Sequence, residues 1–267
     1  MPKTTQATSS DGIMAVSLAL QIFEKLAHSD EPLRVTDLAQ ALGTSKTRVF
    51  RYLRTLIGLG YVIQDPQTER YGVGIRLALL ATALSARFDL LKATLPILRQ
   101  VRDTLGQTVV MSFIEDGEIY PVQQVNGSSM ITFNTQMGMP LGLHNSAQGK
   151  LSLAYGPPEL LERVLQGTLK KVGARTIVDP AQLRAEIEGV RERGWAVAPS
   201  ETLSGLNALA MPIFTSHRKI VATLGLLGSI DEIPALPSAH QIDTLRAAAE
   251  ELAHRLQDSP LMIGAAR

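Results

Sequence analysis

The first 74 residues contain three short amphipathic helices followed by two strand-like runs, an order that few folds accommodate. Apolar residues recur at helical spacing from Asp11, again after Thr36, and a third time after Thr44 or Ser45. The runs YVIQ and RYGVG then flank residues 65–69, whose composition is that of a hairpin loop. Three helices and a hairpin in this order predict a winged helix-turn-helix domain over residues 11–74.

The third predicted helix is cationic on the side opposite its apolar stripe. Val49, Leu53 and Leu56 form the stripe, and no acid occurs between Asp37 and Asp65. A single helix fits the major groove of DNA, about 12 Å wide, where basic side chains reach phosphates and base edges. We therefore predict a double-stranded DNA operator as partner. The predicted contact residues are Ser45, Lys46, Thr47, Arg48, Arg51, Tyr52, Arg54 and Arg70.

A cationic helix face has other interpretations. With 26 basic against 25 acidic residues the net charge is only +1, so a surface for nucleic acid must be local. Basic residues on one helix are often only a solvated face, and short three-helix units also mediate protein contacts. A ligand-independent protein-interaction module is therefore one alternative, and salt dependence of DNA binding separates it from a DNA-binding protein.

Residues 75–88, IRLALLATALSARF, are apolar on more than one helical face. Such a helix must be covered on several sides, which predicts a linker helix packed between domains, between protomers or both. A core helix within a single chain is the alternative. A homodimer would suit DNA reading, because two-fold protein symmetry matches palindromic half-sites.

Residues 89–260 alternate helices with strands that are joined by hairpins. Asp116-Gly117 lies between two strand-like runs, and a polar turn at residues 217–219 joins two more. Hairpins imply antiparallel pairing, so the predicted fold class is α+β, with an antiparallel sheet in a sensor-like second domain. Residues 1–10 and 261–267 are predicted to be tails, the first of them disordered.

Several classes of chemistry lack their motifs in this chain. It has no cysteine, and its five histidines show no pair at metal-ligand spacing, so neither a metal nor a cofactor is expected. The polar N-terminus and the absence of an apolar span predict a cytoplasmic protein without membrane contact. We expect no enzymatic activity; the sharpest alternative is a small-molecule hydrolase with Ser146 as nucleophile, activated by Lys150 or His144.

Three segments resemble the IclR family of transcriptional regulators. TDLAQALGTSKTRVFRYLRTLIGLGYVIQDPQTERYGVGIRLALL resembles its helix-turn-helix, wing and linker helix, and PLGLHNSAQGKLSLA resembles its signature loop and following helix. GWAVAPSETLSGLNALAMPIF resembles the segment that lines its ligand pocket. The resemblance implies a winged N-terminal domain, a GAF-like C-terminal domain that binds a small metabolite, and assembly as dimers or dimers of dimers.

The same resemblance implies where an effector binds. Free N–H groups at the start of the helix after Asn145 would suit the carboxylate of a small organic acid. This chain has Ala208, Gly225 and Leu227 where relatives often carry a cysteine or hydroxyl residues, so we expect an aromatic or otherwise partly apolar acid that modulates operator affinity. The implied pocket residues are Met111, His144, Asn145, Ser146, Ala147, Glu201, Asn207, Ala208, Gly225 and Leu227.

Overall fold

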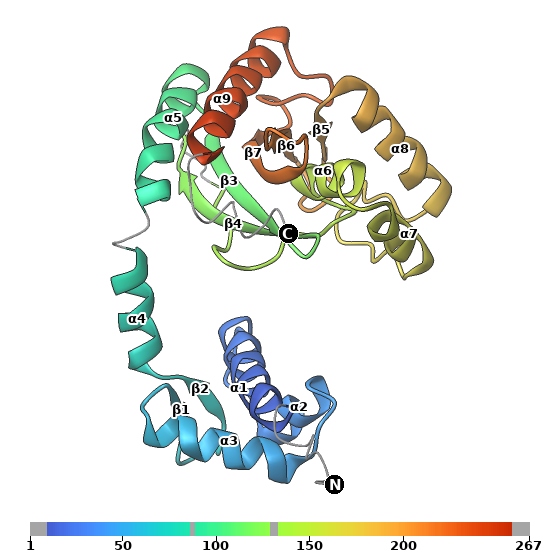
Figure 1. Cartoon of the computed structure of the whole chain (residues 1–267). Helices are drawn as coiled ribbons and strands as arrows, with labels where there is room; N and C mark the ends of the chain where they lie inside the picture. Colours follow the sequence, from blue (N-terminus) through green and yellow to red (C-terminus); the bar gives the residue numbers. More distant parts are fainter. Residues whose placement is uncertain (1–9, 86–88, 129–132, 258–267) are drawn as a thin grey trace, which may run out of the picture. The chain divides into compact units, whose positions relative to one another are not determined.

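The computed structural model describes residues 10–85, 89–128 and 133–257, and the chain divides into two compact units. The first unit is Met1–Phe88 and the second is Asp89–Arg267 (Figure 1). The predicted tails, apart from Ser10, and the last three residues of the predicted linker helix lie outside the described residues.

The first unit contains three helices and a two-stranded wing. The helices are α1 (Ser10–Ala27), α2 (Val35–Ala41) and α3 (Lys46–Gly58), and β1 (Val62–Gln64) pairs antiparallel with β2 (Tyr71–Val73). Ser45 begins α3, because its hydroxyl accepts a hydrogen bond from the backbone N–H of Arg48. The predicted stripe of α3 lies in the core of this unit, together with apolar residues from α1, α2 and both strands. The winged helix-turn-helix is confirmed.

Helix α4 (Ile75–Ser85) follows the wing and exposes much of its apolar surface. Ile75 is 70% exposed, Leu79 is 61% exposed, and Leu80 and Leu84 are also open to solvent. The rest of the first unit therefore leaves this helix uncovered on more than one side. An apolar surface of this kind marks an interaction site in soluble proteins.

The second unit is a five-stranded antiparallel sheet between two layers of helices. The strands β3 (Thr108–Glu115), β4 (Glu118–Val125), β5 (Ala196–Val197), β6 (Leu206–Phe214) and β7 (Ile220–Ser229) lie in the order β4-β3-β7-β6-β5. Every neighbouring pair is antiparallel, as the hairpins predict. The α+β class is confirmed, with helices on both faces of the sheet.

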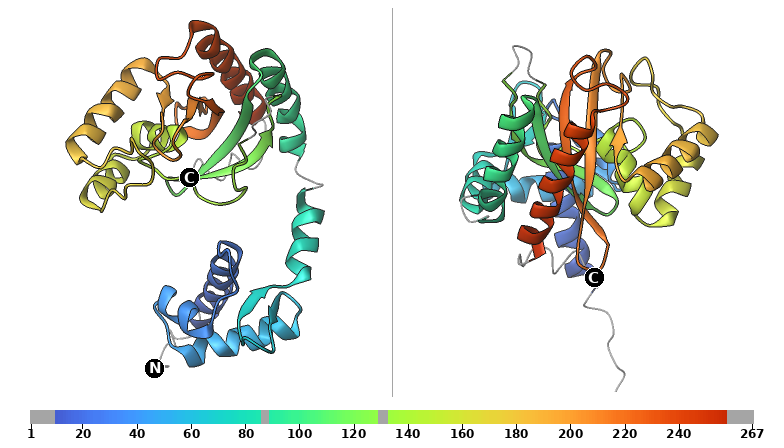
Figure 2. Two further views of the ribbon diagram at one scale, coloured as in Figure 1. Left: turned by 180° about the vertical axis from the view of Figure 1, so that it is seen from behind. Right: turned by 90° about the horizontal axis from the view of Figure 1, so that it is seen from above.

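The two helical layers enclose separate cores. Helices α5 (Asp89–Leu105) and α9 (Ala239–Gln257) cover one face, with Met111, Leu209 and Leu224 in the core beneath them. Helices α6 (Ala147–Tyr155), α7 (Pro158–Gln166) and α8 (Pro180–Arg193) form the other layer, around Leu151 and Ala210. The right-hand view of Figure 2 shows red α9 and yellow-to-gold α6–α8 on opposite sides of the strands. Which face a strand residue occupies therefore decides whether it can reach α6.

Two negative findings apply to the described residues alone. None of their helices has the length and apolarity that crossing a membrane requires. Nor do they bring three or more histidine, aspartate or glutamate side chains together in a way that could hold a metal ion.

Candidate functional site

The exposed face of α3 carries most of the predicted cations. Val49 and Leu53 are fully buried on the opposite side, which fixes the rotation of the helix. Lys46, Arg51 and Arg54 are exposed together with Thr47, and Arg48 is half-buried at the edge of this face. Within the described part of the chain, no ion pair involves these four basic residues. Their charges are thus available to an external polyanion.

Two other predicted DNA contacts have partners within the fold. Arg70, on the wing, donates to the carbonyl of Pro32 at 3.0 Å and lies 3.6 Å from a carboxylate oxygen of Glu31. Tyr52 is half-buried and packs against the core of the first unit. Arg70 and Tyr52 therefore make contacts within the first unit, whereas the other predicted contact residues of α3 point outward or lie at the edge of its exposed face. Ser45 is exposed, and its hydroxyl caps the helix.

In the second unit, Ser146 organises the start of α6. Its Oγ donates to the carbonyl of Gly142 at 2.7 Å and accepts from the N–H of Gly149 at 2.9 Å. Helix geometry leaves the N–H groups of Ala147 and Gln148 without a carbonyl partner inside the helix. These two groups and the positive end of the helix dipole favour an anion at this place.

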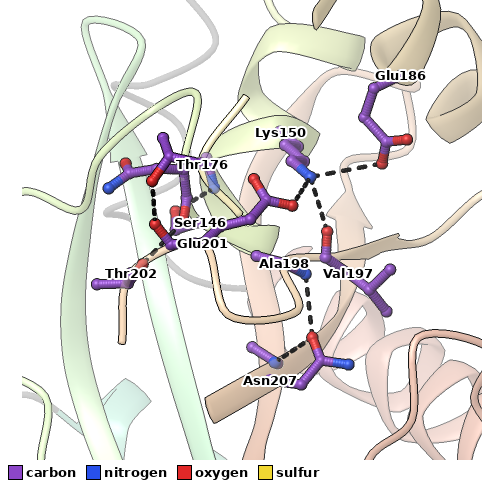
Figure 3. A network of polar contacts seen from close by, with 12 residues as sticks. Ser146, Lys150, Thr176, Glu186, Val197, Ala198, Glu201, Thr202 and Asn207 are labelled. Carbon is purple, nitrogen blue, oxygen red and sulfur yellow. Dashed lines mark hydrogen bonds and ion pairs between the residues drawn. The ribbon is translucent and has the colours of Figure 1, made fainter. Parts of the chain in front are cut away.

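Lys150, one turn further along α6, is the largest of the fully buried side chains, with 1% exposure. Its ammonium contacts Glu201 Oε1 at 2.5 Å, the carbonyl of Val197 at 2.9 Å and Glu186 Oε1 at 3.5 Å (Figure 3). Glu186 also accepts from Arg193 at 2.7 Å. Two contacts of Lys150 therefore connect α6 to residues 197–201: the ion pair with Glu201 and the hydrogen bond to the carbonyl of Val197.

The loop that carries Glu201 is held by two threonines. Thr176 Oγ1 donates to the carbonyl of Glu201 at 2.6 Å, and Thr202 Oγ1 donates to the carbonyl of Asn145 at 2.8 Å (Figure 3). Burial raises the pKa of Glu201 above its usual range, although the charge of Lys150 opposes this shift. Within the described residues Glu201 Oε2 and Asn145 Oδ1 are buried without a hydrogen-bond partner. The carboxylate of Glu201 lies beside Lys150 and Asn145 Oδ1 lies against Gly142, so both unpaired acceptors are in segments that pack around the start of α6.

Two predicted pocket residues face the other helical layer. Met111 is fully buried in the core beneath α5 and α9. Asn207 is also fully buried, and its Oδ1 accepts from the N–H groups of Ala198 and Ala208. Its Nδ2 donates to the carbonyls of Ile233 and Pro234. The structure thus gives Met111 a core position and Asn207 a bracing role between loops, and it brings neither to the α6 face through its side chain.

The remaining strand residues lie on the α6 side of the sheet. Ala208 packs against the core under α6, and it is paired in register with Leu227. Gln148 covers Gly225 closely, since a Cβ on that glycine would lie 2.8 Å from Gln148 Nε2. Gln148 also accepts from Ser112 Oγ at 2.9 Å and donates to the carbonyl of Val110 at 3.1 Å. The side-chain amide of Gln148 therefore occupies the space that the missing side chain of Gly225 leaves.

His144 is engaged away from Ser146, at 3.0 Å from the carbonyl of Lys170 through Nε2. It lines a groove of about 420 Å³ with residues from α7 and the following loop. Both hydrogen-bond partners of the Ser146 hydroxyl are backbone groups, and Lys150 is bound to Glu201 and Val197. The arrangement that the hydrolase alternative requires, a basic side chain on Ser146 Oγ, is not formed among the described residues.

Sequence reasoning missed Gln148, Ser112 and the pairing of Lys150. Ser112 carried a signal, because it is the one polar residue in the otherwise apolar run VVMSFI. Lys150 had no such signal, since a lysine one turn into a helix is usually exposed. Its partner Glu201 lies 51 positions later in the chain.

Replacing Gly149 by alanine should destabilise the second unit. A Cβ at this position would overlap the backbone carbonyls of Gly142 and Leu143, and backbone cannot move aside as a flexible side chain can. We expect Gly149→Ala to lower the free energy of unfolding by about 1–3 kcal/mol, as overpacking does. Urea unfolding followed by the fluorescence of Trp195, the single tryptophan, measures this for the second unit.

Gly167→Ala is the matched control for this variant. The nearest neighbour of a Cβ on Gly167 is the carbonyl of Val164 at 3.4 Å, which is an ordinary contact, and its φ is −83°. Its unfolding free energy should stay within about 0.5 kcal/mol of the wild type. Equal midpoints and slopes for the two variants would contradict the close packing of α6 on the Gly142 loop.

Comparison with known proteins covers both units. Residues 15–66 match the IclR helix-turn-helix domain, and residues 82–254 match the bacterial transcriptional regulator IclR C-terminal domain. The transcriptional repressor IclR of Escherichia coli is 27% identical over 235 residues, 87% of this chain and 86% of that protein. The regulator BhcR of Paracoccus denitrificans is 29% identical over 247 residues, 92% of this chain and 88% of that protein.

Solved structures agree with these matches. A crystal structure of an IclR regulator from Silicibacter sp. TM1040 has a TM-score of 0.78 at 26% identity and covers 92% of this chain and 97% of its own. An IclR homologue from Microbacterium hydrocarbonoxydans, complexed with 4-hydroxybenzoate, has a TM-score of 0.71 at 20% identity and covers 92% of this chain and all of its own. The chain belongs to the IclR family of bacterial transcriptional regulators, with a DNA-binding helix-turn-helix at its N-terminal end.

Proposed function

We propose that the chain is a cytoplasmic, dimeric transcriptional regulator that places α3 in the major groove of a palindromic operator. The observation that carries this proposal is the exposed cationic face of α3, where Lys46, Arg51 and Arg54 have no acidic partner among the described residues. Thr47 and Arg48 extend the contact surface. Arg70 is left out, since its guanidinium binds Pro32 and lies beside Glu31.

The proposed dimer rests on the apolar side chains that the single chain leaves exposed. Ile75 and Leu79 on α4 are more than half exposed, as are Val16 and Leu20 on α1. Burying such residues against a second copy would stabilise a dimer by roughly 25 cal/mol for each Å² of apolar area removed from water. A two-fold dimer presents two recognition helices, which is what a palindromic operator requires.

The proposed effector is a small, partly apolar carboxylic acid at the N-terminus of α6. Its carboxylate would meet the N–H groups of Ala147 and Gln148, and the buried acceptors Asn145 Oδ1 and Glu201 Oε2 would suit a hydroxyl or another donor on the ligand. Ala208 and Leu227 offer apolar surface on the same side of the sheet. The related structure that holds 4-hydroxybenzoate supports an acid of this class.

The proposed switch couples the two sites through the packing of the protomers. An acid that binds one packing better than another changes the spacing of the two α3 helices. A coupling of about 1–3 kcal/mol corresponds to roughly 5- to 150-fold in operator affinity. Gln148 would have to share or leave the space over Gly225 when the ligand binds.

A titration with four acids tests the effector proposal. We expect 4-hydroxybenzoate or benzoate to change the fluorescence of Trp195 and the affinity for operator DNA, and glyoxylate and pyruvate to do neither. Leu227→Ser should lower the affinity for the aromatic acids about tenfold, because it removes apolar contact with the ligand. Leu203→Ser, on the exposed loop, should leave this affinity unchanged. A response to glyoxylate or pyruvate alone would contradict the apolar pocket, and operator affinity unaffected by every acid would contradict the switch.

A further inference from the structure

Phe50 is an exposed aromatic residue that lies between Lys46 and Arg54 on the cationic face of α3. Its side chain is 45% exposed, whereas the stripe residues Val49 and Leu53 on the same helix are fully buried. Phe50 is not among the apolar residues that pack against the core of the first unit. Single exposed apolar side chains are common, so exposure alone would mean little. The position of this one is what matters.

Phe50 follows Thr47 by three positions and precedes Arg54 by four. Residues three and four apart are neighbours on a helix surface, so Thr47, Phe50, Arg51 and Arg54 form one continuous patch. Thr47, Phe50 and Arg51 lie in the first two turns of α3, which begins at Lys46, and Arg54 follows in the third turn. In helix-turn-helix proteins the N-terminal residues of the recognition helix are the ones that reach base edges.

The major groove offers an apolar group at only one of the four bases. Adenine, guanine and cytosine present hydrogen-bond donors and acceptors there, whereas thymine adds the 5-methyl group. A phenyl ring gains no binding free energy from phosphates or from the polar edges of bases, but it does gain binding free energy when it covers a methyl group. Lys46 and Arg54, one helical turn before and after Phe50, can hold the ring against the duplex through contacts with the phosphates.

We propose that Phe50 covers the 5-methyl group of a thymine in each operator half-site and thereby determines specificity at that base pair. The inference rests on the proposed placement of α3 in the major groove. Phe50 would then distinguish one base pair from another, whereas the basic residues of α3 mainly supply affinity for DNA. Neither Arg51 nor Arg54 can supply this discrimination through phosphate contacts, because those are the same at every base pair.

The test uses the full chain and a pool of duplexes with a random 24-base-pair core, from which the wild type selects its binding sites. The selected sites should contain one fixed thymine in each half-site. Replacing that thymine by deoxyuridine removes only the methyl group, and it should weaken wild-type binding about fourfold per half-site. With Phe50→Ala the same replacement should have no effect, and selection at that position should relax.

Two further variants complete the design. Phe50→Leu retains an apolar side chain and should keep part of the sensitivity to deoxyuridine. Leu59→Ala, which truncates an exposed apolar residue at the end of α3, should keep all of it. Phe50 is exposed, so Phe50→Ala should preserve the circular dichroism spectrum and the oligomeric mass of the wild type.

The possible failures are distinguishable. Wild-type protein that binds every selected duplex equally well with thymine or deoxyuridine would overturn the role of Phe50 and leave DNA binding through α3 intact. The same holds if Phe50→Ala changes the oligomeric mass but not the thymine preference, since Phe50 would then belong to a protein interface. Wild-type protein that enriches no duplex would overturn both this inference and the proposed placement of α3.

Discussion

Lys150→Met should lower the free energy of unfolding of the second unit by about 3–5 kcal/mol, as removal of one partner from a buried ion pair does. Methionine fills a similar volume, so the loss comes from charge and not from a cavity. The variant leaves the buried carboxylate of Glu201 without its ammonium partner and takes a donor from the carbonyl of Val197. Urea unfolding followed by Trp195 fluorescence measures the effect.

A double variant separates charge from packing. Lys150→Met/Glu201→Leu removes both members of the pair, and well-packed apolar replacements of ion pairs are often neutral. We expect it to recover most of the stability that Lys150→Met loses, and the difference gives the coupling between the two side chains. A double variant as unstable as the sum of its single variants would show that Lys150 and Glu201 do not interact.

The stability of Lys150→Met should also depend on pH. Burial already raises the pKa of Glu201, and removing Lys150 removes the charge that opposes this shift. A carboxyl group whose pKa is higher in the folded state favours folding at low pH, and this contribution is lost as the pH rises from the ordinary value near 4.5 through the raised one. The variant should therefore lose more stability than the wild type between pH 5 and pH 8.

Arg51→Gln/Arg54→Gln should reduce affinity for operator DNA by about 2–6 kcal/mol per recognition helix, roughly 30-fold to more than 10⁴-fold. Both arginines are exposed on α3, so their replacement removes contacts with phosphates and base edges without disturbing the core. Fluorescence anisotropy with a labelled operator at fixed salt measures the loss. The circular dichroism of the variant should equal that of the wild type.

Arg246→Gln/Arg255→Gln is the matched control for charge. It also removes two positive charges, but from exposed positions on α9, in the second unit. The control should bind the operator within about twofold of the wild type. If it lost as much affinity as the α3 variant, net charge and not the position of the arginines would explain DNA binding.

Local sequence signals predicted much of the fold. The helices of the first unit followed from apolar spacing, and several ends followed from single residues. Ser45 caps α3, as one of the two residues expected to begin that helix, and Gly194 ends α8 with φ 81° after Asp179 caps its start. Such signals act within a few residues of the chain, so they are readable without tertiary structure. Two helix starts were wrong: α1 begins at Ser10 and not after Asp11, and α2 begins after Arg34 and not at Thr36.

The candidate site was less predictable, because long-range packing decides it. VVMSFI is apolar on both faces of β3, since helices cover both sides of the sheet, so alternation could not show that Met111 faces α5 and α9. The burial of Lys150 depends on the distant Glu201, and the contact of Gln148 with Gly225 crosses from helix to sheet. The family resemblance supplied the candidate residues of the site but not the directions of their side chains.

The salt dependence of operator binding tests the central claim most directly. For the wild type, the logarithm of affinity should fall linearly with the logarithm of salt concentration, by about 0.9 for each phosphate that a cation contacts. Arg51→Gln/Arg54→Gln should have a slope shallower by about 0.9 per lost contact. The α9 control should keep the wild-type slope. The same slope in all three proteins would contradict this prediction, because it would mean that the cations of α3 do not lie against the phosphates of the duplex.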